Sequence, residues 1–340
     1  VKASYGGVLL VMTILDGNDQ VFPAALGIAE SENQETWSWF LGLVRASFGI
    51  DNGDGLVFLS DREKGIENAV SNLFPNAAHS FYVYHIQKNV KARFKTSFNA
   101  LLFKAAKTSS PTDFHKIIDE IKSLHNSAGS YIEEINPERW ARAFFPSHRF
   151  GHVTSNISES MNWWLEDARH MEPVALFCCY IRKPNLLFDR RRHDHGLSNL
   201  MGLPENVYEL FNMSVEGSRS LRVVQHTNAL FEVQRMNDPT HFRVVNLEAR
   251  ICSCGFFREF GVPCRHVCAA LLSVKQNPIS FVCQERRLEA LQMTYIGRTI
   301  PVDVCQLDDD GMKPPVETKR RGRPKEKRYV SSTEKSREKR

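Results

Sequence analysis

Four potential metal ligands stand in two pairs in the C-terminal third of the chain. One residue separates Cys252 from Cys254, and after a gap of nine residues Cys264 and His266 repeat that spacing. Residues two apart on an extended chain point to the same side, so each pair can grip one ion from one side. Zinc prefers four thiolate or imidazole ligands in a tetrahedron, which two such pairs supply. The pattern therefore predicts one structural Zn²⁺ bound by these four residues.

A fifth candidate ligand, Cys268, lies one helical turn beyond Cys264. We favour His266 because it completes the paired spacing. Strand-like residues 229–250 precede the ligands, and an apolar helix is expected over 267–274, where the helix dipole also favours a thiolate at its start. The alternative is that four buried residues are close in sequence by coincidence.

Two carboxylates, Asp61 and Glu159, stand where a divalent ion could bind. Asp61 directly follows the apolar, strand-like residues 56–59, and α/β sheets place ligand-binding side chains at the carboxyl ends of strands. Carboxylate oxygens suit Mg²⁺ or Mn²⁺, and two such ions about 4 Å apart can activate a nucleophile and stabilise the leaving oxygen of a phosphodiester. The alternative for Asp61 is a helix cap, and Glu159 also fits a capping box that begins at Asn156.

Residues 1–190 resemble the transposases of Mutator-like elements (MULEs) in several runs that occur in the family's order. These runs are Tyr5-Gly6-Gly7-Val8-Leu9-Leu10, Asp16-Gly17, Phe22-Pro23-Ala24, Trp37-Ser38-Trp39-Phe40, Leu59-Ser60-Asp61-Arg62-Glu63-Lys64-Gly65, Trp140-Ala141, Thr154-Ser155-Asn156 and Glu159-Ser160-Met161-Asn162. The resemblance implies an RNase H-like fold in which Asp, Asp and Glu hold divalent metal. It assigns Asp61 as the second carboxylate and Glu159 as the third.

The chain departs from that family at two places. The first catalytic Asp of the family lies on the strand before Tyr5, whereas this sequence begins at Val1. We therefore expect that Asp and most of the first strand to be missing, and the fragment as given to be inactive. The family also carries Cys and His three residues apart where this chain has Tyr82 and His85. His85 is expected as an accessory residue near the site, the alternative being a structural histidine.

The cysteine spacing and its neighbours resemble a second family, the SWIM zinc finger. The flanking residues Gly261-Val262-Pro263 and Ala269-Ala270-Leu271-Leu272 carry this resemblance together with the four ligands. Such fingers occur in transposases and in chromatin or ubiquitin-related proteins. The resemblance therefore implies binding of nucleic acid or protein and does not itself name an enzyme.

Hydrophobic periodicity predicts the elements that position these residues. Residues 5–15 and 21–29 are apolar and strand-like, and the turn-prone residues 16–19 join them as a hairpin. Helical spacing of apolar residues over 33–48 and 62–74 alternates with short buried strands at 56–59 and 81–84. This order predicts an α/β domain, and the charged, strand-free residues 86–150 predict an all-α insertion in it.

These patterns and the two resemblances together imply five segments. They are an RNase H-like domain at 1–190, a linker at 191–219, a small ββα zinc finger at 220–276, a C-terminal extension at 277–310 and a disordered basic tail at 311–340. The tail holds 12 Lys and Arg residues against 4 Glu, while the whole chain has a formal charge of only +5. Such an asymmetry favours attachment of the tail to a polyanion.

The tail also contains an AT-hook-like core, Arg321-Gly322-Arg323-Pro324. Extended arginines beside Gly and Pro can enter the narrow minor groove of A·T-rich DNA, and the same basic run can act as a nuclear import signal. DNA is thus the expected partner and the nucleus the expected location. The alternative is a plain solvated tail.

The sequence therefore predicts a metal-dependent DNA transposase. The principal alternative is a transposase-derived transcription regulator that keeps the fold and the finger and binds DNA without catalysis. A third hypothesis makes the finger a protein-interaction module. Homo-oligomer formation stays open, and no membrane segment is expected because the longest apolar run, 8–15, is far shorter than the ~20 residues a span requires.

Overall fold

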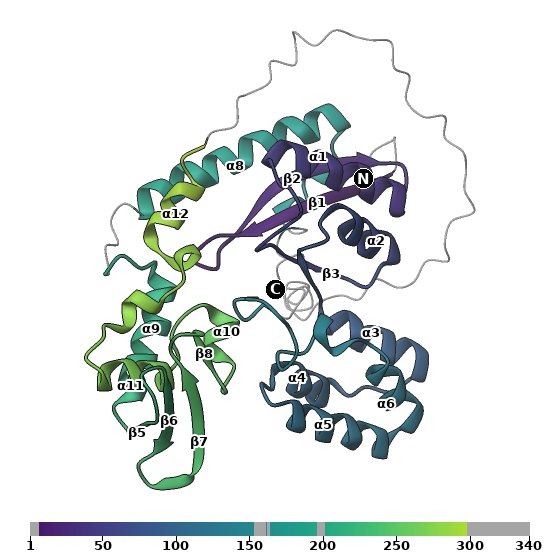
Figure 1. Ribbon diagram of the computed structural model, residues 1–340. Helices are drawn as coiled ribbons and strands as arrows, with labels where there is room; N and C mark the ends of the chain where they lie inside the picture. The colour runs from purple at the N-terminus through teal and green to yellow at the C-terminus, as the bar shows by residue number, and fades with distance from the viewer. Residues whose placement is uncertain (1–6, 153–160, 162–163, 196–200, 298–340) are drawn as a thin grey trace, which may run out of the picture. The chain divides into compact units, whose positions relative to one another are not determined.

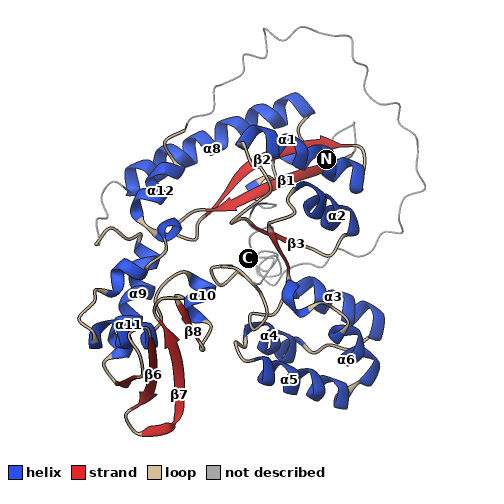
Figure 2. Ribbon diagram, viewed as in Figure 1, coloured by secondary structure: helices blue, strands red, loops and turns tan. Residues whose placement is uncertain are grey.

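The computed structural model describes residues 7–152, 161, 164–195 and 201–297. Glu159, the AT-hook-like residues 321–324 and the rest of the basic tail lie outside the described residues. The described chain is a mixed α/β protein with a helical insertion and a small C-terminal antiparallel sheet (Figure 1; Figure 2).

An antiparallel hairpin begins the described chain, as predicted. It consists of β1 (Val8–Leu15) and β2 (Val21–Ala29). The register shifts between Met12 and Thr13, opposite Pro23, and such a bulge is one of the few places where a strand tolerates proline. Helix α1 (Gln34–Phe48) follows, capped by the side chain of Asn33, and its apolar face packs on the hairpin.

A parallel pair of strands carries Asp61 at its carboxyl edge. Strand β3 (Val57–Ser60) pairs with β4 (Ala78–Phe81), and helix α2 (Lys64–Leu73) connects them. The predicted strand at 81–84 is wrong by three residues, because His79 and Ser80 lie buried in β4 while Val83 already begins a helix. These polar side chains are tolerated inside because Ser60 Oγ lies 2.8 Å from His79 Nε2 and Ser80 contacts Arg149.

The two strand pairs form separate sheets among the described residues, so a continuous RNase H-like sheet is not seen there. They nevertheless share one apolar core. Leu10 of β1, Phe40 of α1 and Val70 of α2 belong to the same buried cluster. The α/β layer arrangement predicted from the sequence is therefore present, with the hairpin and the parallel pair joined by packing.

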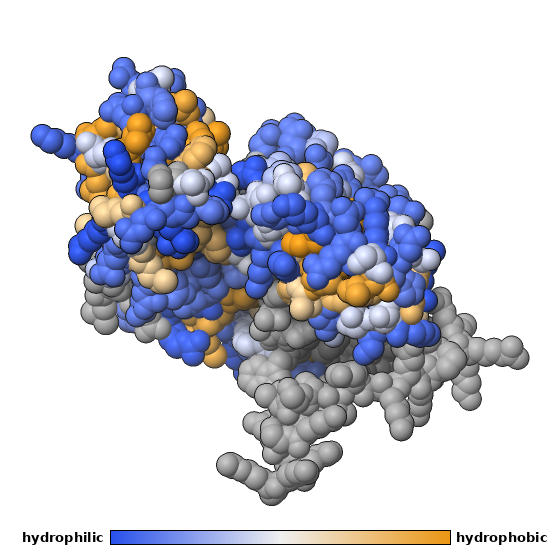
Figure 3. All heavy atoms as spheres, turned by 90° about the horizontal axis from the view of Figure 1, so that it is seen from below, coloured by the Kyte–Doolittle hydropathy of each residue, from blue (hydrophilic) through white to orange (hydrophobic). Residues whose placement is uncertain are grey.

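The helical insertion is all-α, as predicted. It contains α3 (Val83–Phe94), α4 (Asn99–Lys107), α5 (Pro111–Leu124), α6 (Asn126–Glu133) and the short helix η1 (Pro137–Arg139). Ser110 caps α5 and Pro111 occupies its first turn, where proline needs no backbone donor. Apolar side chains from all four α-helices surround the fully buried Trp140 in one core. The face shown in Figure 3 carries mostly hydrophilic side chains, interrupted by smaller apolar patches.

The segment expected to be a linker is largely helical. After η2 (Ala168–His170), helix α8 (Pro173–His195) runs beyond the predicted boundary at residue 190, and α9 (Glu205–Ser218) fills most of 201–219. Val207 and Phe211 of α9 pack with Val262 and Val282 in a buried cluster. The apolar face of α9 thus joins this segment to the C-terminal module.

The C-terminal module has a four-stranded antiparallel sheet rather than the two strands expected of a ββα finger. Its elements are β5 (Leu221–Gln225), β6 (Leu230–Arg235), β7 (Asp238–Asn246), β8 (Ile251–Cys252), α10 (Phe256–Phe260) and α11 (Arg265–Ser273). Phe231 and Val245 from the sheet pack against Val267 and Leu271 of α11. The extra strands thereby give the ligand-bearing segments a larger apolar support than two strands could.

The residues after the module fold back onto the first hairpin. They contain η3 (Pro278–Phe281), η4 (Gln284–Arg286) and α12 (Leu288–Thr294). Tyr295 donates its hydroxyl proton to Asp16 over 2.5 Å, and Arg286 contacts both carboxylate oxygens of Asp19 at 2.6 and 2.9 Å. Burial alone would raise the pKa of Asp19, but its hydrogen bonds with His152 and Arg286 outweigh burial and lower that pKa.

A buried ion pair joins the module to the rest of the chain. Glu259 of α10 lies 3.4 Å from Arg149, and the side chains of both residues are almost inaccessible to solvent. Arg149 also donates to the carbonyl oxygen of Trp140 over 2.9 Å and to Ser80 of β4 over 3.4 Å. Burial lowers the pKa of Arg149, and Glu259 opposes that effect. One guanidinium therefore connects α10, β4 and the end of the helical insertion.

Among the described residues, no helix combines the length and the apolar character that crossing a bilayer requires.

Candidate functional site

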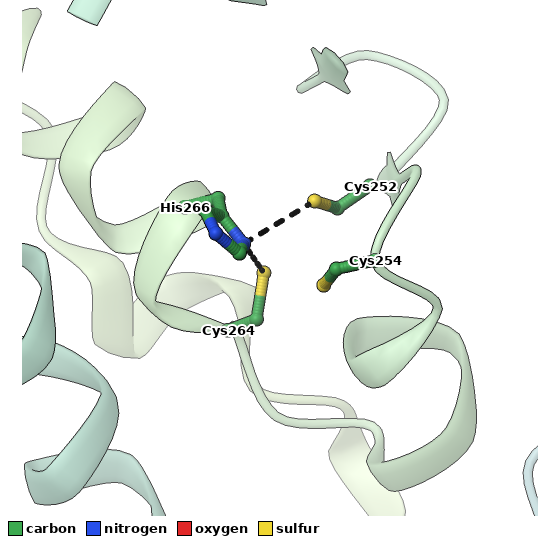
Figure 4. A group of neighbouring side chains, drawn as sticks. All are labelled: Cys252, Cys254, Cys264 and His266. Atoms are coloured by element: carbon green, nitrogen blue, oxygen red, sulfur yellow. Dashed lines mark hydrogen bonds between the residues drawn. The ribbon is translucent and has the colours of Figure 1, made fainter. Parts of the chain in front are cut away.

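The four predicted zinc ligands lie together. The ligand atoms of Cys252, Cys254, Cys264 and His266 all fall within 4.8 Å of one another, and Figure 4 shows the side chains converging on a common centre. His266 Nδ1 lies 3.8 Å from the sulfur atoms of both Cys252 and Cys264. A tetrahedral zinc ion with bonds of about 2.3 Å to sulfur and 2.0 Å to nitrogen separates its ligands by about 3.6 Å. The spacing of the cluster is that of a zinc tetrahedron.

Local structure explains how two short segments present these side chains. Cys252 ends β8, and the turn that follows brings Cys254 back toward it, with Gly255 in the left-handed conformation at φ 72°. Glycine adopts that conformation more readily than other residues because it has no Cβ. Cys264 is the N-cap residue of α11, and His266 lies in its first turn. The local backbone of each segment therefore places its two ligands side by side.

The chemistry of the donor set fits Zn²⁺. Hydrogen bonds from Cys252 and Cys264 lower the pKa of the Cys254 thiol, and the thiolate is the form of cysteine that binds zinc. Three sulfurs and one imidazole, partly or fully buried, form a closed site without room for a substrate. This arrangement is that of a structural rather than a catalytic metal centre.

Cys268 lies outside the cluster. Its thiol is fully buried and donates to the carbonyl oxygen of Pro263 over 3.7 Å. Burial raises the pKa of this thiol to about 12, but the pKa of Cys252 is raised to about 12 as well, so position and not acidity separates Cys268 from the cluster. The structure thus groups His266, and not Cys268, with the other three candidates.

Asp61 lies directly after β3 and is not the cap of the following helix. The N-cap of α2 is Glu63, whose carboxylate accepts from the backbone of Gly65 at 2.6 Å and of Ile66 at 3.2 Å. Among the described residues, the one hydrogen bond to the Asp61 carboxylate is a long contact of 3.4 Å from the backbone nitrogen of Glu63. The capping alternative for Asp61 is therefore not supported, and its carboxylate retains capacity to accept further bonds.

The carboxyl edge of the parallel pair brings other polar groups beside Asp61. Tyr82 follows β4 and donates its backbone N–H to Ser60 over 3.1 Å. Burial raises the pKa of the Tyr82 phenol to about 12, and the charge of Asp61 contributes. Burial also lowers the pKa of His79 to about 4, which keeps this histidine neutral. The tyrosine that stands in place of the family's cysteine thus faces the negative charge of Asp61.

Glu32 is a neighbour of Asp61 that the sequence did not single out. Burial raises its pKa, and the nearby charges of Asp61 and Glu63 raise it further. Glu32 stands in the loop between β2 and α1, far from Asp61 in sequence. Its position in the short loop between a predicted strand and a predicted helix was the available signal, and many surface glutamates share that signal.

His85 lies in the first turn of α3, where its ring is 6.0 Å from that of Tyr82 and 5.9 Å from that of Tyr84. Tyr82 is therefore a neighbour both of Asp61, whose charge raises its pKa, and of His85, whose ring it approaches. Glu159 is outside the described residues, so its distance to Asp61 stays a prediction.

Comparison with known families matches two parts of the chain. Residues 2–89 match the MULE transposase domain, and residues 231–275 match the SWIM zinc finger. The first match includes Asp61, Tyr82 and His85, and the second includes all four clustered ligands. The chain therefore contains a MULE transposase domain and a SWIM zinc finger. No curated protein matches the chain.

Proposed function

We propose that this chain is part of a Mutator-like DNA transposase that cleaves and transfers DNA strands with divalent metal held by Asp61 and Glu159. The observation that carries the proposal is the position of Asp61, which lies at the carboxyl edge of a parallel strand pair within the MULE domain and leaves capping to Glu63. Mg²⁺ or Mn²⁺ bound there would supply Lewis-acid activation of the phosphodiester. Tyr82 and His85 would line the site as accessory residues.

The finger and the tail have separate roles in this proposal. Zn²⁺ bound by Cys252, Cys254, Cys264 and His266 would hold the C-terminal module in its folded form. The module and the AT-hook-like residues Arg321, Gly322, Arg323 and Pro324 would bind DNA, and the basic tail would direct the protein to the nucleus. The RNase H-like assignment of residues 1–190 belongs to the same proposal.

Metal binding tests the catalytic part. Mn²⁺ is titrated into the full chain with duplex DNA present, and bound Mn²⁺ is followed by electron paramagnetic resonance. Asp61→Asn and Glu159→Gln should each weaken Mn²⁺ binding about tenfold or more, because each removes a charged oxygen ligand. Asp54→Asn is the matched control, since Asp54 is an exposed acid bonded to Asn76 and should leave binding unchanged.

A chain that binds DNA but shows no Mn²⁺ site sensitive to Asp61 would favour the alternative function, a transposase-derived regulator. The same conclusion would follow if an experimental structure placed the carboxyl groups of Asp61 and Glu159 on opposite sides of the sheet. The transposase proposal instead expects them within about 10 Å of each other, close enough to share metal ions.

A further inference from the structure

Two arginines from different parts of the α/β domain converge on one tyrosine. Arg62 stands between Asp61 and the cap of α2, and its Nη1 donates to the hydroxyl of Tyr131 in α6 over 2.9 Å. The guanidinium carbons of Arg62 and Arg93 lie 5.9 and 5.0 Å from the centre of the Tyr131 ring. Arg93 belongs to α3, so three separate elements build this group. Both guanidinium groups pack against the ring of Tyr131, and each also lies beside a phenylalanine ring.

Neither arginine has a carboxylate partner within 4 Å among the described residues. Arg139, which shares the Phe81 ring with Arg62, differs in this respect because it pairs with Glu67 at 3.6 Å. Both guanidinium groups pack on the Tyr131 ring, so an anion bound at this ring gains attraction from two positive charges. A bound anion would supply the counter-charge that the described residues do not place beside these two arginines.

The surrounding sequence is cationic as well. Residues 68–112 contain no Asp or Glu, and they carry six cations, namely Lys88, Lys91, Arg93, Lys95, Lys104 and Lys107. Basic residues in the last turns of α3 and α4 also offset the helix dipoles, which gives a structural reason for some of them. That reason does not apply to Arg62, because it precedes the N-terminus of α2, where the dipole disfavours a cation.

We propose that Arg62 and Arg93 together bind a backbone phosphate of DNA beside Asp61. This inference rests on the proposed function, which identifies the polyanion as DNA, and it names two residues that would position that DNA. Guanidinium groups match phosphate oxygens with two parallel donors each, and stacking on an aromatic ring holds such a group in place without neutralising it. Tyr131 acts as a positioning residue, because its ring and hydroxyl fix Arg62. A phosphate held here would place the strand next to the residue proposed to bind the catalytic metal.

The salt dependence of DNA binding tests the proposal. The full chain binds a fluorescently labelled duplex in anisotropy titrations between 0.05 and 0.5 M salt, and the logarithm of affinity is plotted against that of salt concentration. Each phosphate contact contributes a slope of about 0.9, which corresponds to about eightfold in affinity at 0.1 M salt relative to 1 M. Because both arginines contact one phosphate in this proposal, the double variant Arg62→Gln with Arg93→Gln should lower the slope by about 0.9 and the affinity at 0.1 M by roughly eightfold.

The matched control is Lys116→Gln, which removes an exposed cation of the same insertion that already pairs with Asp113 at 3.9 Å, and it should change the slope little. Arg62→Lys with Arg93→Lys keeps the charges and should restore most of the slope, whereas a purely structural brace through the Tyr131 hydroxyl would give no such restoration. Thermal unfolding of each variant separates loss of binding from loss of folding. A folded glutamine double variant with the wild-type slope would overturn the phosphate site alone. A wild-type chain that binds no DNA would overturn both this inference and the proposed function.

Discussion

Replacing Glu259 with leucine should destabilise the contact between the C-terminal module and the rest of the chain, because no other carboxylate of the described residues pairs with the fully buried guanidinium of Arg149. Glu259 lies 3.4 Å from Arg149 and 3.7 Å from Arg142, and its side chain is only 2% exposed. Removing one partner of a buried ion pair leaves an uncompensated charge and typically costs about 3–5 kcal/mol. We expect a loss of about 3 kcal/mol in the free energy of unfolding, since Arg149 keeps its bond to the Trp140 carbonyl oxygen.

Urea unfolding followed by tryptophan fluorescence measures this loss. The chain has five tryptophans, and Trp140, fully buried beside Arg149, contributes the part of the signal that reports on the ion pair. Glu248→Gln is the matched control, because Glu248 is an exposed acid of the same module and should change stability by less than about 0.5 kcal/mol. The double variant Arg149→Met with Glu259→Leu should recover most of the loss, since an apolar pair of similar volume can replace a buried ion pair.

The reasoning would be refuted by a Glu259→Leu variant that loses less than about 1 kcal/mol, a value ordinary for any surface substitution. It would also be refuted if the double variant were less stable than the sum of its two single changes. Either result would mean that solvent or another group compensates the charge of Arg149.

Three further predictions follow from the site and its supports. Purified protein should carry about one Zn²⁺ per chain by metal analysis, and Cys252→Ser should lose this ion whereas Cys268→Ser should retain it. Chelation of the ion should unfold residues 240–275 while the α/β domain survives. The reverse pattern for the two variants would exclude His266 as the fourth ligand. His79 takes up its proton near pH 6.5 in the unfolded chain but only near pH 4 in the folded chain. The free energy of unfolding should therefore fall by about 3 kcal/mol as the pH drops through that window. A His79→Gln variant with an equally steep decline would contradict this assignment. Because the pKa of Asp19 is lowered in the fold, the stabilisation that its ionised carboxylate gives is present above pH 4 and lost below it. Asp19→Asn should therefore lower the melting temperature at pH 7 and flatten the acid side of the stability profile. An unchanged melting temperature would mean that Arg286 finds another partner.

Local sequence patterns predicted the elements whose residues act over short distances. The hairpin at β1 and β2, the helical insertion and the cysteine spacing could all be inferred, because turn residues, apolar periodicity and paired ligands are encoded within a few residues of one another. The zinc cluster is the clearest instance. Cys252 and Cys254 are positioned by one turn, Cys264 and His266 by one helix start, and only the approach of the two pairs required folding.

Strand β4 shows where local patterns fail. Apolar content placed the strand at 81–84, whereas the structure uses 78–81 with His79 and Ser80 inside. Burial of a polar group depends on whether a distant residue can bond to it, and Ser60 and Arg149 supply those bonds from 19 and 69 residues away. No window of sequence around β4 contains that information.

The electrostatic relations around Asp61 were likewise decided by tertiary structure alone. The sequence could nominate Asp61 as a metal ligand or a helix cap, but only the bonds of Glu63 to the start of α2 separate the two roles. Glu32, Tyr82, Arg93 and Tyr131 acquire their relation to this region because four chain segments meet there. Residue type and spacing fix what a side chain can do, whereas its neighbours in space decide which of those things the fold allows, because Coulomb and hydrogen-bond energies depend on distance in space and not along the chain.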